Sequence, residues 1–355
     1  MDSHLWHRQA IGKPSVLPEP VTSAELAKLT EEARVDYARR VREGLRRQAL
    51  ASPIHDAVAE QMTAALQSAS LDPPGARTIL SLSAPFAAGK STMIKRWAQG
   101  LHRSWLPEGD HKGLPRWSPS PGILADVIPV NYMTLLADSR GTDLYAQLLS
   151  FANADAGGAV RTIVQRAVNA LRRHGTRLVI IDDAHMLRTA SVTGRATLNA
   201  VKHLNTELGE LGGVLVLVGA NLTGGDVLND EQIRGRLSQH SFGAYEIDSH
   251  AGRRDWQRFL KACEEVLLPY LPLNHAGDFA MKHSAYLWVR TTGYVGDASR
   301  LLIDATADAL AMGSAVNRHT LERIALSQRA QDAERDLRST RATRGSQGVV
   351  GKAVG

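Results

Sequence analysis

Cysteine is nearly absent from this chain. Its 355 residues include a single cysteine, Cys263, so a disulfide within the chain and a metal cluster held by several thiolates are both excluded. Cys263 falls in a stretch with helical apolar periodicity, residues 256–268. We therefore expect this thiol to be a packed core residue.

Long apolar runs are missing as well. Stretches such as residues 214–220 are far shorter than the roughly 20 apolar residues that a transmembrane helix needs. The N-terminus, Met1-Asp-Ser-His-Leu-Trp-His7, lacks the basic segment followed by an apolar segment that marks a secretory signal. We expect a soluble, cytoplasmic protein with no membrane partner.

Neither sign of charge is in large excess. The 42 Lys and Arg residues against 36 Asp and Glu residues give a net charge of +6, and the pI is about 9.5. This mild basic balance favours a polyanionic partner without identifying one. A length of 355 residues suits either one core-bearing domain with extensions or two domains.

The most informative segment is a loop between an apolar run and a helical pattern. The apolar run covers residues 78–83, and the helical pattern starts at Met93. The loop matches G-x-x-x-x-G-K-[ST], except that Ala84 replaces the first glycine and so reduces the backbone freedom there. In such a loop the backbone N–H groups surround a β-phosphate, the lysine reaches the β and γ oxygens, and the next hydroxyl binds Mg²⁺.

The loop therefore predicts that the chain binds a nucleoside triphosphate with Mg²⁺, through Lys90 on the phosphates and Ser91 on the metal. The alternative is that Gly89, Lys90 and Ser91 merely begin a helix. The residues that we expect to hold the nucleotide are Ala84, Pro85, Phe86, Ala87, Ala88, Gly89, Lys90, Ser91 and Thr92.

Paired carboxylates follow a second apolar run about ninety residues after the loop. The strand candidate 178–181 ends in Asp182 and Asp183, as the second acidic box of P-loop ATPases requires. Asp182 would hold Mg²⁺ through its water shell, and Asp183 would polarise the attacking water. Many ATPases carry the longer glutamate at the second place, so turnover is expected to be slow. The alternative is two solvated acids at a strand end.

Three further polar residues extend this pattern. Asn221 follows the strand candidate 214–218, where an amide either orients the water near the γ-phosphate or only forms a turn. His185 either relays the nucleotide state or is satisfied by local hydrogen bonds. The segment 293–300 opens a later helical pattern, and its Arg300 can fold back onto the nucleotide of its own chain.

Two arginines, Arg234 and Arg236, precede the last strand candidate, residues 244–247. An arginine presented there can reach the γ-phosphate bound to the adjacent subunit and stabilise the charge that develops during hydrolysis. We assign this role to Arg236, with Arg234 as the second choice. The alternative for both is a surface arginine.

Strand and helix patterns alternate through the middle of the chain, which predicts a parallel sheet covered on both faces. The stretch 104–122 is expected to be a surface loop, whose Lys112, Arg116 and Trp117 are either solvated or contact nucleic acid. The strand candidates are residues 78–82, 123–130, 178–181, 214–218 and 244–247.

The two ends of the chain lack strand patterns. Residues 23–70 are helical and rich in arginine, with Ser23 as the expected N-cap, and this surface is either solvated or contacts a phosphate backbone. Helical patterns dominate again after Ser249. The tail from about residue 330 has no apolar periodicity and is expected to be disordered.

Taken together, these motifs resemble the AAA+ ATPases and, more narrowly, the TniB/TnsC-like ATPases of bacterial transposons. The likeness covers approximately residues 35–325, and Arg300 lies one place beyond the arginine of the frequent Gly-Asp-x-Arg form. The narrower resemblance rests on Ile181-Asp-Asp-Ala-His-Met-Leu187, Thr197-Leu-Asn-Ala-Val-Lys-His-Leu-Asn-Thr-Glu-Leu208, Val216-Leu-Val-Gly-Ala-Asn221 and Gly293-Tyr-Val-Gly296 ahead of Arg300.

The resemblance implies a P-loop AAA+ three-layer parallel sheet with a small all-helical lid. It also implies an ATPase that forms a homo-oligomeric ring or filament on duplex DNA, recruits or activates a transposase, and helps choose the target site with a target-selection protein. Rival functions are remodelling of another nucleoprotein, as in helicase loading or phage defence, and a nucleotide-gated scaffold. The expected domains are 1–75 (N-terminal helices), 76–250 (ATPase), 251–328 (lid) and 329–355 (tail).

Overall fold

The computed structural model describes residues 1–12, 16–48, 50–109, 112–136, 139–186, 192–222 and 230–350, apart from the side chains of residues 192, 193 and 340–350. The chain forms two compact units. We call them the sheet unit, which comprises Met1–Gly12, Ala57–Phe86 and Lys90–Phe242, and the helical unit, which comprises Lys13–Asp56, Ala87–Gly89 and Gly243–Gly355. Residues 1–75, expected to form one N-terminal segment, are thus divided between the two units.

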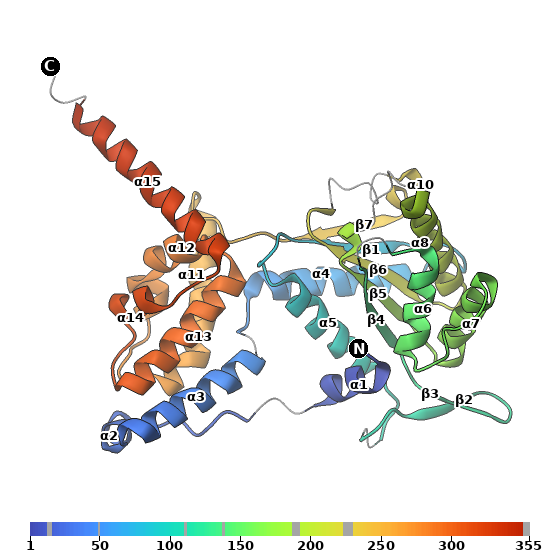
Figure 1. The fold of residues 1–355 in the computed structure, drawn as a ribbon, viewed down its shortest axis with the longest axis horizontal. Coiled ribbons are helices and arrows are strands. Elements are labelled where there is room, and N and C mark those ends of the chain that lie inside the picture. The colour runs from blue at the N-terminus through green and yellow to red at the C-terminus, as the bar shows by residue number, and fades with distance from the viewer. Residues whose placement is uncertain are drawn as a thin grey trace. The chain divides into compact units, whose positions relative to one another are not determined.

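A five-stranded parallel sheet forms the centre of the sheet unit (Figure 1), and its strand order is β4-β5-β6-β1-β7. Every residue of β1, β5 and β6 is buried, as expected for strands that are covered on both faces. The predicted α/β parallel sheet is confirmed. The strands are β1 (Ile79–Ser83), β4 (Val130–Thr134), β5 (Leu178–Asp182), β6 (Val214–Gly219) and β7 (Leu237–Ser241).

The strand expected over residues 123–130 is wrong. The structure divides it into β3 (Ile123–Asp126) and β4, and Pro129, which has no N–H to donate, lies between them. Strand β3 pairs antiparallel with β2 (Arg116–Ser120), which lies inside the stretch expected to be a surface loop. The sequence did not indicate this hairpin, because most of its residues are exposed and show no apolar alternation.

The strand expected over residues 244–247 is also wrong. The last strand of the sheet is β7, which pairs with β1 and whose mixed sequence Leu-Ser-Gln-His-Ser gives little apolar signal. Residues near Tyr245 are apolar for another reason. The Tyr245 N–H donates to the carbonyl oxygen of Gly293, and its side chain is buried in the core of the helical unit.

Helices cover both faces of the sheet. On one face α6, α7 and α8 pack against alternate residues of the strands, among them Val179, Ile181 and Leu217 (Figure 1). On the other face, α1 packs on α5, and Trp6 of α1 stacks on Tyr132 of β4. The helices are α1 (Ser3–Ile11), α4 (Pro53–Ser70), α5 (Lys90–Ser104), α6 (Gly141–Phe151), α7 (Val160–Arg173), α8 (Val192–Glu210) and α10 (Glu231–Arg234), with a 3₁₀ turn at Ala184–Met186.

The helical unit is built around a core that includes Trp256, Phe259 and Phe279, each almost fully buried. The thiol of Cys263 is buried in the same core, as expected for a packed residue, and burial raises its pKa. The helices are α2 (Ser23–Lys28), α3 (Glu31–Gln48), α11 (His250–Leu267), α12 (Ser284–Thr291), α13 (Val295–Met312), α14 (Arg318–Arg323) and α15 (Gln328–Val350), with short helical turns at Leu268–Tyr270 and Asp278–Lys282.

Two details at the ends of helices differ from the expectations. The N-cap of α2 is Thr22 and not Ser23, because Thr22 and Glu25 form a reciprocal capping box. The tail expected to be disordered from residue 330 instead continues in α15 as far as Val350, and residues 351–355 lie outside the described part. Tertiary contacts stabilise the start of this helix, because Ala330 is fully buried and Glu334 forms an ion pair with Arg290. The sequence pattern does not show these contacts.

Candidate functional site

The predicted phosphate loop connects the end of β1 to the start of α5 at Lys90. Gly89 has φ +90°, and Ala87 has φ +64°, a left-handed conformation that is strained for a residue with a Cβ. Ala84 has no positive φ, and its N–H donates to the carbonyl oxygen of Gly219. The position where the motif usually has glycine therefore accepts alanine without left-handed strain.

The loop residues differ in their exposure. Ala84, Ala88 and Lys90 are buried, and Pro85 and Gly89 are half-buried. Phe86, Ala87, Ser91 and Thr92 are exposed. The hydroxyl of Ser91, the predicted metal ligand, is therefore accessible at the first turn of α5.

The side chains of Lys90, Asp182 and Asp183 meet at the carboxyl ends of β1 and β5. The Nζ atom of Lys90 lies 3.9 Å from Oδ1 of Asp182 and 3.7 Å from Oδ1 of Asp183. Lys90 and Asp182 are almost fully buried, whereas the Asp183 side chain is 35 % exposed. The structure thus brings together a cation suited to phosphates and two carboxylates, the arrangement on which the predicted roles depend.

Asp183 lies one residue beyond the end of β5, and Asn221 lies two residues beyond the end of β6. Both have left-handed backbones, with φ +56° and +50°, which aspartate and asparagine adopt more readily than other residues that carry a Cβ. His185 bridges these two strand ends, because its Nδ1 accepts a hydrogen bond of 3.4 Å from the N–H of Ala220. The contact joins residues 35 apart in the sequence, so it is not one of the local hydrogen bonds expected for His185. The roles of Asp183 and Asn221 stay predictions.

Tyr132 is a member of this group that sequence reasoning missed. Its hydroxyl donates to Oδ2 of Asp182, and its pKa is raised by burial and by the neighbouring Asp182 carboxylate. Nothing in the local sequence marks Tyr132, because it belongs to a strand whose boundaries were misplaced. Its contact with Asp182 arises only from the pairing of β4 with β5.

The tip of the loop, Ala87–Gly89, belongs to the helical unit. His55 donates through Nε2 to the carbonyl oxygen of Ala88 at 2.9 Å, and its ring lies so close to Gly89 that a Cβ there would be 2.7 Å from Cε1. The N–H of Gly296, in the first turn of α13, donates to the carbonyl oxygen of Ala87 at 3.3 Å. Sequence reasoning missed His55 as well, because it lies outside every recognised motif.

The three predicted arginines are exposed. Arg234 ends α10, and Arg236 directly precedes β7, where its carbonyl oxygen accepts a hydrogen bond of 2.7 Å from Ile79. The backbone of Arg236 is thus fixed by the sheet while its side chain remains free to reach outwards. Arg300 lies on α13, and its Nε is 3.8 Å from the Asp304 carboxylate, so its predicted contact with nucleotide would have to replace this ion pair.

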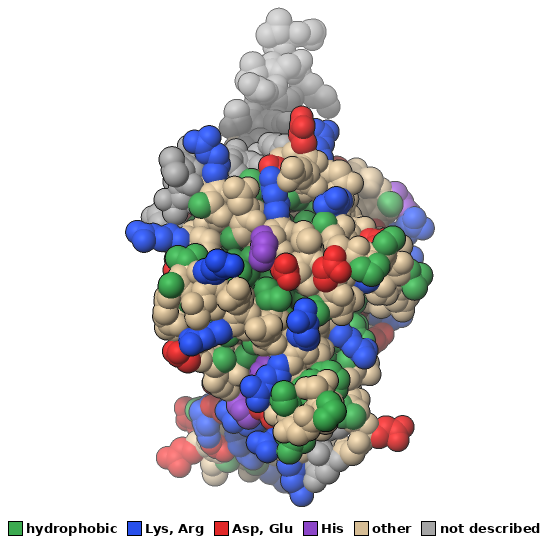
Figure 2. Space-filling model, turned by 90° about the vertical axis from the view of Figure 1, so that its right-hand side faces the viewer, with side chains coloured by type: hydrophobic (Ala, Val, Ile, Leu, Met, Phe, Trp, Pro, Cys, Tyr) green, Lys and Arg blue, Asp and Glu red, His purple; other side chains and the backbone are tan. Residues whose placement is uncertain are grey.

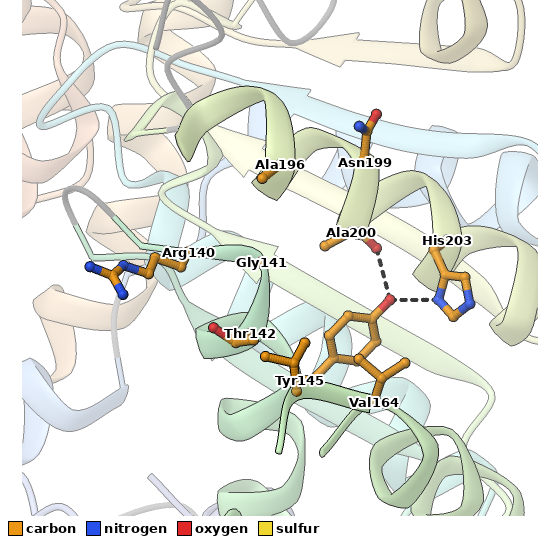
Figure 3. Close-up of a pocket in the computed structure, with 10 residues that line it drawn as sticks. Arg140, Gly141, Thr142, Tyr145, Val164, Ala196, Asn199, Ala200 and His203 are labelled. Atoms are coloured by element: carbon orange, nitrogen blue, oxygen red, sulfur yellow. Dashed lines mark hydrogen bonds between the residues drawn. The ribbon is translucent and has the colours of Figure 1, made fainter. Parts of the chain in front are cut away.

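A separate apolar pocket of about 580 Å³ lies between α6, α7 and α8 (Figure 3). The ring of Tyr145 points into it, and its hydroxyl lies 2.7 Å from Nδ1 of His203 and donates to the carbonyl oxygen of Ala200 at 3.1 Å. None of the residues predicted to bind nucleotide or metal lines this pocket. It is therefore not the predicted nucleotide site.

No group of three or more His, Cys, Asp or Glu side chains in the part of the chain that the structure describes is arranged to hold a metal ion. Among the same residues, no helix combines the length and the apolar character that crossing a membrane requires.

Several solved structures have limited similarity to this chain. The ORC2 protein of Aeropyrum pernix, solved in ADPNP and ADP complexes, is 13% identical with a TM-score of 0.48, over 76% of this chain and 66% of that chain. AMPPCP-bound DnaA of Aquifex aeolicus is 12% identical with a TM-score of 0.43, over 78% and 66%. The RuvB Holliday junction branch migration motor of Thermotoga maritima is 12% identical with a TM-score of 0.42, over 76% and 67%. The chain thus spans about two thirds of the length of each.

No curated protein gives a significant match. The model of the family described as bacterial TniB protein matches residues 52–247, which is more than half of the chain and includes the phosphate loop, both aspartates, Asn221 and Arg236. With its parallel sheet and the phosphate loop after the strand next to β7, this chain has the P-loop AAA+ fold and belongs to the bacterial TniB family.

Proposed function

We propose that this protein is an ATP-dependent, DNA-associated AAA+ oligomer that recruits or activates a transposase and helps to select the target site. ATP binding is supported by one observation above all: Lys90 lies close to Asp182 and Asp183 at the end of the sheet, next to the phosphate loop. The match to the TniB family supports the role in transposition.

The site also offers oxygen atoms that suit Mg²⁺. Ser91 offers an exposed hydroxyl at the start of α5, and Asp182 offers a carboxylate 3.9 Å from the Lys90 ammonium, a donor set that magnesium accepts. Lys90 would contact the β- and γ-phosphates, and Ser91 and Asp182 would hold the metal ion. When bound, Mg²⁺ neutralises charge on the phosphate oxygens.

Hydrolysis would then depend on side chains that orient water. Asp183 is partly exposed beside Lys90, so its carboxylate can accept a proton from a water molecule near the γ-phosphate. Asn221 would orient the same water from the end of β6. Arg236 would complete the site of the neighbouring subunit, and this shared site would make assembly into a ring or helical filament dependent on ATP.

Duplex DNA is the polyanionic partner that this proposal assigns. Helix α7 carries Arg161, Arg166, Arg172 and Arg173 and no acidic residue. Figure 2 shows that Lys and Arg side chains are spread over the face on which α7 lies and are not gathered into one groove. Such a distribution suits contact with phosphates more than recognition of bases.

A salt series tests the DNA part of the proposal. We expect the full chain with ATP to bind unrelated duplexes similarly, and its affinity to fall linearly with salt concentration on logarithmic axes. Electron microscopy should show rings or filaments on DNA with ATP and none for Lys90→Ala. A strong preference for one sequence, or no binding at low salt, contradicts this part.

The gene neighbourhood tests the transposition part separately. A transposase reading frame beside this one, and binding of that transposase to the ATP-loaded oligomer, are the expected results. ATP-dependent filaments without any transposase partner would instead point to remodelling of another nucleoprotein, and ATP binding without DNA affinity would point to a scaffold.

A further inference from the structure

The two carboxylate oxygens of Asp182 have different surroundings. Oδ1 accepts the N–H of Asp183 at 2.9 Å and faces Lys90. Oδ2 accepts the hydroxyl of Tyr132. Because each oxygen has its own donor, a partial rotation of the carboxylate about Cβ–Cγ would weaken both hydrogen bonds. The two donors therefore fix the plane of the carboxylate, and one oxygen, Oδ1 in this structure, stays directed towards the lysine.

The pairing of β4 with β5 places Tyr132 to reach this oxygen. Tyr132 lies opposite Ile180, two residues before Asp182, so the side chains of Tyr132 and Asp182 lie on the same face of the sheet. The tyrosine is 3 % exposed. Removal of its hydroxyl would leave Oδ2 buried without its donor, which is a costly state for a charged group.

The ring of Tyr132 is held by the N-terminal helix. Trp6 of α1 stacks on it with the ring centroids 5.3 Å apart and an angle of 17° between the planes. Trp6 itself is fully buried. The ammonium of Lys95, on α5, lies 5.4 Å from the centroid of the tyrosine ring. The position of the Tyr132 hydroxyl thus depends on Trp6, which lies in the N-terminal helix α1.

Helix α1 is itself anchored on α5. Nδ1 of His7 lies 3.1 Å from Nε2 of His102, with both rings buried, and Arg103 donates to the carbonyl oxygen of Ala10 at 2.6 Å. Since α5 begins at Lys90, the same helix carries the predicted phosphate-binding lysine at its start and the contacts of α1 near its end.

We propose that Tyr132 is a positioning residue that orients the metal-binding carboxylate of Asp182, and that α1, through Trp6, is part of this nucleotide site. In this proposal Tyr132 acts on the metal only through its hydrogen bond to Asp182. The inference rests on the proposed Mg²⁺-dependent ATP function and adds to it a control of metal affinity by the N-terminal helix. Loss of groups that orient a metal ligand typically weakens metal affinity or activity about 10-fold to 100-fold.

The central test is Tyr132→Phe in the full chain, which removes one hydroxyl and keeps the ring. We expect the affinity for ATP in excess EDTA to be unchanged, because the loop and Lys90 are intact. The Mg²⁺ concentration that gives half of the metal-dependent gain in ATP affinity should rise about 10-fold. Tyr145→Phe is the matched control, since it also removes a buried phenol hydroxyl from the sheet unit (Figure 3) and should leave this concentration unchanged.

The role of α1 is tested with Trp6→Leu, which keeps a smaller apolar side chain but removes the flat ring, and Trp6→Phe, which keeps a ring. Trp6→Leu should raise the Mg²⁺ requirement and Trp6→Phe should not. The double variant of Tyr132→Phe with Trp6→Leu should be no worse than Tyr132→Phe alone, because both changes act through the same oxygen.

The outcomes separate the two hypotheses. If the wild-type chain does not bind ATP, the proposed function is wrong. If it binds ATP with Mg²⁺ and Tyr132→Phe shows a wild-type metal requirement, the positioning role is wrong. Effects of Tyr132→Phe and Trp6→Leu that multiply in the double variant would show that α1 acts by another route and overturn the part assigned to it.

Discussion

His55 donates a hydrogen bond of 2.9 Å to the carbonyl oxygen of Ala88 and so restrains the phosphate loop from outside its motif. Its ring also leaves no room for a side chain at Gly89, where a Cβ would lie 2.7 Å from Cε1. The left-handed backbone of Gly89 and the contact with His55 therefore both require glycine at this position.

Replacing His55 should weaken nucleotide binding without abolishing it. A neutral hydrogen bond contributes about 0.5–1.5 kcal/mol, so His55→Ala should raise the Kd for ATP roughly 2-fold to 12-fold. Titration with a fluorescent ATP analogue measures the change. His203→Ala, which removes an imidazole that also contacts a hydroxyl but lies away from the loop, is the control and should bind ATP like the wild type. Equal affinities of all three proteins would show that the His55 contact does not restrain the loop.

Lys90→Ala should abolish high-affinity ATP binding, because it removes the ammonium that faces the predicted phosphate site and leaves Asp182 and Asp183 without it. The same titration measures the loss, and Lys282→Ala, on the helical unit, controls for the loss of one positive charge. A Lys90→Ala protein that bound ATP as tightly as the wild type would exclude the predicted role of the loop.

Asp183→Asn should retain ATP binding and lose hydrolysis. Asparagine tolerates the left-handed backbone at this position, so the change removes the carboxylate charge with little strain. The contacts of Asp182 are preserved if the main chain stays in place. Phosphate release measured beside nucleotide binding separates the two effects, and unchanged turnover would show that another group orients the water.

Gly293→Ala should destabilise the helical unit severely. Gly293 has φ +75°, and a Cβ there would lie 2.0 Å from the carbonyl oxygen of Tyr245, so the backbone would have to move. Gly313→Ala is the matched control, because its φ is +63° but its nearest neighbours are at 3.7 Å. The control should cost about 1–2 kcal/mol from the left-handed backbone alone, and Gly293→Ala a further ~1–3 kcal/mol or more. Thermal unfolding of both proteins checks that Gly293→Ala is the less stable of the two. Equal melting temperatures would contradict this prediction.

Arg236 should act on the neighbouring subunit. Arg236→Ala should leave ATP binding by the monomer nearly intact while removing a charge-assisted contact of about 1.5–3 kcal/mol per hydrogen bond, so assembly and hydrolysis should fall together. Mixing Arg236→Ala with Lys90→Ala protein should restore part of the ATPase activity, because one shared site then has both residues. Arg234→Ala is the comparison, and normal assembly of Arg236→Ala alone would move the role to Arg234 or elsewhere.

The sequence by itself determined the central strands and indicated the residues of the candidate site. Buried parallel strands are nearly continuous apolar runs, so β5 and β6, and β1 with its two serines, could be located without any tertiary information. The phosphate loop and the aspartates follow two of these runs directly. Parallel strands share one carboxyl edge, and this rule alone predicts that Lys90 and the two aspartates lie near one another.

Tertiary structure alone decided what lies around these residues. Edge strand β7 and the β2–β3 hairpin have no continuous apolar pattern, and the apolar residues near Tyr245 pack in the helical core and not in the sheet. Tyr132 and His55 reach Asp182 and Ala88 across 50 and 33 residues of sequence. Such contacts depend on strand pairing and helix packing between distant segments, which local propensity and periodicity do not encode.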